Sequence, residues 1–236
     1  MQYCFHHIPK TAGSSLQLRL AHREHIGELP KGSTLIVYPL YDQMRYYRVS
    51  TDVGFNPEEP IKTAFLRTYK NKTEGNATIV SGHYTNITQP GKHYVWMRDP
   101  LLRDISHFNY DCKFNHELSK DFATHLSLMS GNFVVLWLYG KYCGKHDSVT
   151  MEQRYNFVRK VCKEKFETIY DSEKFEESWT EICKELKVSP EPRLNSNQSD
   201  KEYNKIVKLQ DLSDNFKNWH RAYNEYDYKL YEEFCA

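Results

Sequence analysis

YCFHHIPKTAGSS, residues 3–15, is the stretch from which the fold of this chain can first be inferred. The apolar run from Tyr3 to Phe5 is typical of a buried strand, and Pro9 and Gly13 then interrupt that pattern. Leucines at helical spacing begin at Leu16, just behind two serines that we expect to cap a helix. The stretch therefore predicts a strand, a tight loop and a helix.

The loop of this stretch has the features of an anion site. Backbone N–H groups at the start of a helix form its positive end, where phosphate and sulfate groups bind. Lys10 adds a full charge, and hydroxyl donors come from Thr11, Ser14 and Ser15. An ordinary strand-to-helix turn with a solvated lysine is the alternative interpretation.

Length and composition limit the classes of protein to consider. The 236 residues suit a single α/β domain over 1–236, and the net charge of +1 argues against a general nucleic-acid-binding surface. No apolar run is long enough for a transmembrane helix, and the N-terminus has no signal-peptide pattern, so we expect a cytoplasmic protein. A Golgi-lumenal domain cut from a longer chain is the alternative, which would give meaning to four glycosylation sequons, at Asn71, Asn76, Asn86 and Asn197.

The six cysteines give no sign of a metal site. They form no CxxC pair and no His/Cys group with zinc-finger spacing, so no metal is expected. Their even number permits disulfides without implying them.

The remaining patterns alternate between strands and helices in the first half and are mostly helical in the second. Further strands are expected at 35–37, 77–80, 93–97 and 168–170, and residues 61–69 fit either a strand or a helix. Helices are expected from Pro100, with Asp99 as its cap, at 175–186, and in one long C-terminal segment. The aromatic residues of that last helix are expected in the core: Phe216, Trp219, Tyr223, Tyr226 and Phe234.

Such an alternation predicts an α/β fold with a mainly parallel sheet covered on both faces, that is, a three-layer α/β/α arrangement. Ligands in these sheets bind at the carboxyl ends of the strands. Three polar motifs fall at predicted strand ends: residues 10–15, Gly82-His83 and Arg98-Asp99-Pro100.

The loop does not have the form of a nucleotide-triphosphate P-loop. That motif needs Gly-x-x-x-x-Gly-Lys-Ser/Thr, whereas Lys10 here precedes Gly13 and the first glycine is missing. A magnesium-dependent kinase is therefore disfavoured but kept as an alternative. Arg98 and Ser106 have side chains suited to a second phosphate, and Arg103 would either join them or form an ion pair on the helix surface. A structural salt bridge is the alternative role for Arg98.

Two motifs about ninety residues apart resemble those of sulfotransferases. HIPKTAGSS at 7–15 is similar to their 5′-phosphosulfate loop, and Arg98-Asp-Pro-x-x-Arg103-x-x-Ser106 is similar to their 3′-phosphate element. The strongest likeness is to the carbohydrate branch with the heparan sulfate 2-O-sulfotransferases and related bacterial enzymes. That branch has a Gly-His after the middle strand, matched by Gly82-His83. Weaker matches are the segment from Asn132 through Leu138 and Gly140, which is similar to an Asn-x-x-x-x-Leu-x-Gly segment of that branch, and the loop around Arg193.

The resemblance implies a P-loop-like fold and the cofactor 3′-phosphoadenosine 5′-phosphosulfate (PAPS), which leaves as PAP. It implies transfer of the sulfuryl group to an acceptor hydroxyl, with Lys10 on the leaving group and His83 as the base. The cofactor-binding residues it implies are Lys10, Thr11, Ala12, Gly13, Ser14, Ser15, Arg98, Arg103, Ser106 and Arg193.

Several alternatives remain open at this level. A carbohydrate is the expected acceptor, beside a small hydroxylated metabolite or a peptide tyrosine. His83 would also fit a strand-end histidine bonded to backbone, and His6 or His7 would fit the cleft. A non-catalytic nucleotide-binding member of the fold is a further alternative. The sequence makes no prediction about the oligomeric state.

Overall fold

The structure, a computed structural model, describes residues 2–40, 43–48, 78–83, 85, 87–113, 121–143, 148–190 and 206–235. The undecided segment 61–69 and the loop around Arg193 lie outside these ranges. The chain divides into two compact units. We call residues 1–96 with 165–196 the sheet unit, and residues 97–164 with 197–236 the helical unit. The expectation of a single domain over 1–236 stays a prediction.

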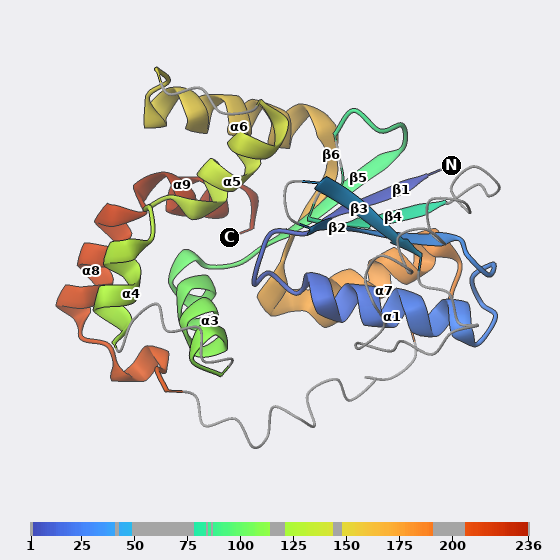
Figure 1. Ribbon diagram of the computed structural model, residues 1–236, viewed down its shortest axis with the longest axis horizontal. Coiled ribbons are helices and arrows are strands. Elements are labelled where there is room, and N and C mark those ends of the chain that lie inside the picture. Colours follow the sequence, from blue (N-terminus) through green and yellow to red (C-terminus); the bar gives the residue numbers. More distant parts are fainter. Residues whose placement is uncertain are drawn as a thin grey trace. The chain divides into compact units, whose positions relative to one another are not determined.

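Within the described residues, the sheet has six strands in the order β3-β2-β4-β1-β5-β6 (Figure 1). Strands β2, β4, β1 and β5 are parallel, and β3 runs antiparallel to β2. Their bounds are β1 Tyr3–His6, β2 Thr34–Leu40, β3 Gln43–Arg48, β4 Ile79–Gly82, β5 Lys92–Met97 and β6 Phe166–Asp171. The predicted α/β class with a mainly parallel sheet is confirmed, and the arrangement is compatible with three layers.

One face of this sheet is covered by two helices, α1 (Gly13–His25) and α7 (Phe175–Leu186), which lie along it in Figure 1. Leu16 and Leu20 of α1 are buried with Trp179 and Ile182 of α7 in one core. The strands add Phe5, Ile79, Tyr94 and Trp96 to the same core. The helical spacing in the sequence therefore placed both apolar faces correctly.

The helical unit is built from α3, α4, α5, most of α6, α8 and α9. Their bounds are α3 Pro100–Lys113, α4 Phe122–Leu128, α5 Phe133–Tyr142, α6 Met151–Lys165, α8 Asp214–Tyr223 and α9 Glu225–Phe234. A core of five buried side chains joins α3 to α4: Leu101, Ile105, Phe108, Phe122 and Leu126. The predicted start of α3 is confirmed, because the backbone N–H of Leu102 donates to Asp99 Oδ1 at 3.0 Å.

The prediction of one long C-terminal helix is wrong. α8 ends at Tyr223 and α9 begins at Glu225, with Asn224 between them. Asn224 Oδ1 accepts a hydrogen bond from the backbone N–H of Asn132 at 2.8 Å, and Asn132 Oδ1 accepts one from the N–H of Tyr226 at 2.7 Å. These paired amides hold the break in place.

The expectation that the whole aromatic stripe lies in the core is also wrong. Trp219 is 43% exposed and Tyr223 is 37% exposed, and their rings stack on each other at 5.3 Å. The spacing of three and four residues continues across the break. It therefore cannot distinguish one long helix with a buried face from two shorter helices. Within the described residues, no helix has the length and apolar character needed to cross a membrane.

Candidate functional site

The loop between β1 and α1 has an uncommon backbone. Lys10 has φ 69° and Ala12 has φ 66°, so two non-glycine residues adopt the left-handed region within three positions. Each such residue costs on the order of 1 kcal/mol, and strained positions of this kind cluster at ligand sites. Ala12 is the N-cap of α1, which corrects the expectation that Ser14 or Ser15 caps the helix. The helix begins one residue before those serines.

The start of α1 is well suited to an anion. Ala12 has no side chain that could accept a hydrogen bond from the first turn, and that turn contains no acidic residue. The helix is therefore not neutralised at its positive end by its own cap. Successive N–H groups around left-handed residues form a concave surface that binds anions.

Thr11 holds this loop together from inside. Its side chain is fully buried, and Oγ1 donates to the carbonyl oxygen of Ile8 at 2.9 Å. The sequence suggested that the Thr11 hydroxyl donates to a bound anion, but its proton is used in this hydrogen bond within the loop. The predicted cofactor contact of Thr11 stays a prediction.

His7 packs directly against Gly13. A Cβ atom placed on Gly13 would lie 2.0 Å from Cδ2 of His7 and 2.2 Å from its Cγ. Real carbon atoms do not approach so closely, so only glycine fits at this position while His7 keeps its place. The His7 ring is also buried.

His83 lies beside the same histidine. Its ring stacks on that of His7 with 4.0 Å between centroids, and its Nδ1 lies 2.9 Å from the carbonyl oxygen of His7. Since a carbonyl only accepts, Nδ1 carries the proton, and Nε2 is the basic nitrogen of the neutral ring. This hydrogen bond from Nδ1 to a backbone carbonyl is the one expected for a strand-end histidine. It also selects the tautomer of His83 that a general base needs.

The strand order brings these parts to one edge of the sheet. His6 pairs with Gly82 on one side and with Val95 on the other, so β1, β4 and β5 end together. The chain leaves β1 toward β2, on the β4 side, and leaves β4 toward β5, on the other side of β1. In such sheets, ligands bind at the point where two neighbouring strands are followed by connections that run in opposite directions along the sheet.

The two adjacent histidines have different partners, as the alternation of a strand requires. His6 Nε2 lies 2.8 Å from His93 Nδ1, and His93 Nε2 lies 2.9 Å from the carbonyl oxygen of Gln89. Both rings are buried. His7, rather than His6, is therefore the histidine at the loop, and sequence analysis left that choice open.

The predicted 3′-phosphate residues lie in the helical unit. Arg98 follows β5 in the chain and is partly exposed, and Ser106 lies on α3 and is partly buried. Arg103 is 2% exposed, forms an ion pair with Asp104, and lies 4.0 Å from the centre of the Phe133 ring. Burial lowers the pKa of Arg103 to about 10. Of the two roles weighed for Arg103, the ion pair is present, but it is buried rather than on the surface.

Arg103 keeps unused donors in that position. Its Nε and Nη1 atoms make no hydrogen bond to any residue that the structure describes. The guanidinium therefore retains the capacity to bind an anion, and its contact with a phosphate stays a prediction. The predicted contact of Arg193 lies outside the described residues.

Comparisons with protein-family models, with curated proteins and with solved structures found no match to this chain.

Proposed function

We propose that this protein is a sulfotransferase that uses PAPS and an acceptor hydroxyl, with a carbohydrate as the acceptor class. The observation that carries the proposal is the packing of His83 onto the loop through His7. It puts an imidazole of defined tautomer beside a strained loop whose helix has no neutralising cap. A base next to an anion site is the combination that transfer from an anionic donor requires.

In this proposal the sheet unit is a P-loop-like fold, and the 5′ end of the cofactor lies on the loop of Lys10, Thr11, Ala12, Gly13, Ser14 and Ser15. The unneutralised start of α1 fits such an anionic group. Arg98, Ser106, Arg103 and Arg193 are proposed to bind its 3′-phosphate, and the unused donors of Arg103 fit that role.

When bound, PAPS supplies the sulfuryl group. Lys10 contributes a cation that stabilises the negative charge left on the departing phosphate. His83 Nε2 takes the proton of the acceptor hydroxyl, while the bond from Nδ1 to His7 keeps the ring in place. The loop amides orient the donor.

Thermal unfolding with PAP, with PAPS and with Mg-ATP tests the cofactor class. A ligand of the folded state at a hundred times its Kd adds about 2.7 kcal/mol of stability. We expect stabilisation by PAP and PAPS without added magnesium. Stabilisation by Mg-ATP alone would support a kinase and refute the proposal.

Variants at the loop then separate binding from transfer. His83→Asn keeps an N–H for the His7 carbonyl but has no base, so it should bind PAP normally and lose sulfate transfer. Lys10→Ala should lose transfer as well. Arg98→Ala should raise the KM for PAPS, whereas Arg159→Ala, which breaks an ion pair with Glu233, serves as the matched control. Normal transfer by His83→Asn would show that the base is another group.

A further inference from the structure

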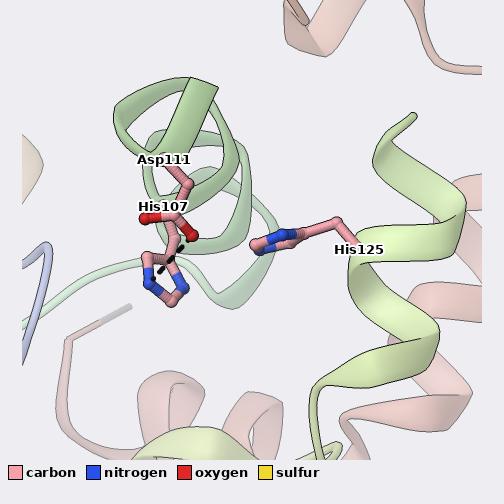
Figure 2. A group of neighbouring side chains, drawn as sticks. All are labelled: His107, Asp111 and His125. Carbon is pink, nitrogen blue, oxygen red and sulfur yellow. Dashed lines mark ion pairs between the residues drawn. The ribbon is translucent and has the colours of Figure 1, made fainter. Parts of the chain in front are cut away.

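Three side chains capable of binding a metal come together inside the helical unit. They are His107 and Asp111 on α3 and His125 on α4 (Figure 2). Each offers one ligand atom, and these atoms all lie within 4.8 Å of one another. We propose that they bind a divalent transition-metal ion of the Zn²⁺ class, which is a site separate from the proposed cofactor loop.

Two helices that pack against each other place these groups. His107 and Asp111 are four residues apart, so they lie on one face of α3, one turn from each other. His125 points toward them from the second helix (Figure 2). α3 and α4 are joined by the shared core of Leu101, Ile105, Phe108, Phe122 and Leu126, which fixes the distance between the two sets of ligands.

The carboxylate of Asp111 supplies the second observation that points to a cation. Asp111 is 7% exposed, and its Oδ2 makes no hydrogen bond to any residue that the structure describes. The imidazole nitrogen Nε2 of His107 lies 3.6 Å from this oxygen, beyond hydrogen-bond distance. Buried carboxylate oxygens without a partner are unfavourable, and a bound cation would satisfy this one.

The distances suit a small metal ion after a modest closure. Zinc binds histidine nitrogens and carboxylate oxygens at about 2.0–2.2 Å, so tetrahedral ligand atoms lie about 3.3 Å apart. The pair His107 and Asp111 is already close to this separation, at 3.6 Å. The ligand atom of His125 lies within 4.8 Å of the other two, so it would need to approach them by up to about 1.5 Å.

Two imidazoles and one carboxylate also form a recognised donor set. Nitrogen ligands favour zinc and its transition-metal neighbours over Mg²⁺ or Ca²⁺, which prefer oxygen. Three protein ligands leave at least one position open for water or another group. The positive charge of Arg103, one turn before His107, is offset by its ion pair with Asp104.

Metal binding to the full chain tests the site. We would measure Zn²⁺ affinity by competition with a chromophoric chelator, and record the visible absorption of the Co²⁺ form to establish the coordination geometry. The expected result is one tight ion per chain. His107→Gln and Asp111→Asn should weaken binding by at least about tenfold, since changes to groups that only orient metal ligands already weaken it by 10- to 100-fold.

His22→Gln, on α1, is the matched control, because it removes a histidine outside the cluster. It should bind the metal as the wild type does. Since His125 is almost fully buried, the more exposed His107 is the safer first substitution, and a circular-dichroism melt checks that each variant is folded. Unchanged affinity in folded His107→Gln, equal losses in His22→Gln, or no stoichiometric binding by the wild type would each overturn the proposal.

Discussion

Replacing Gly13 with alanine should disturb the contact between His7 and the start of α1. The added Cβ would lie 2.0 Å from Cδ2 of His7, whereas nonbonded carbon atoms settle about 3.5 Å apart. The ring must therefore retreat by about 1.5 Å. That displacement is large against the 4.0 Å between the stacked rings of His7 and His83, so the stack cannot persist unchanged.

Overpacking of this kind costs about 1–3 kcal/mol. For a chain of 236 residues, each kcal/mol lowers the melting temperature by about 2–4 °C, so Gly13→Ala should melt about 2–12 °C below the wild type. Differential scanning calorimetry would measure this directly. Gly140→Ala is the control, because a Cβ at that helical position meets no atom within 4 Å. It should stabilise the protein by about 0.5–1 kcal/mol.

A double-mutant cycle with His7→Ala identifies the cause. Without the imidazole, the new methyl group has space, so Gly13→Ala should cost much less in the His7→Ala background than in the wild type. Equal losses in the two backgrounds would refute the reasoning, as would a Gly13→Ala protein that melts no lower than the wild type.

Three other changes have defined outcomes. Thr11→Val removes the hydrogen bond to Ile8 and should cost about 1–3 kcal/mol in urea unfolding, whereas Thr11→Ser should retain most of the stability. Asn132 has φ 59°, so Asn132→Ala should be less stable than Asn132→Gly by about 1 kcal/mol, and equal stability of the two would contradict a left-handed residue there. Burial raises the pKa of Asp227 from 3.8 to about 6. The folded state therefore binds this proton more tightly, and the resulting stability, about 3 kcal/mol, is present below pH 4 and lost as the pH rises through 6. The free energy of unfolding of Asp227→Asn, measured at several pH values, should not show that loss. Parallel pH profiles of the variant and the wild type would contradict a raised pKa of Asp227.

Sequence patterns located most of the elements because the signals are local. The first strand, both helices that cover the sheet, and the Asp99 cap depend on residues within one or two turns of each other. The cap of α1 was placed wrongly because Ala12 adopts a left-handed conformation that its residue type does not favour.

Features that depend on distant residues were not predictable in the same way. The break at Asn224 is held by Asn132, 92 positions earlier, and the His7–His83 contact joins residues 76 positions apart. The cluster at His107 offered a partial signal, since His107 and Asp111 have helical spacing, but nothing local indicates that His125 approaches them. The proposed cofactor contacts in the helical unit stay predictions.

The His6–His93 pair has a fixed polarity. The Gln89 carbonyl accepts only, so His93 Nε2 carries a proton and His93 Nδ1 must accept from His6 Nε2. The seam between β1 and β5 therefore carries a hydrogen-bond chain with a single direction, from His6 on the first strand through His93 on the fifth to the Gln89 carbonyl.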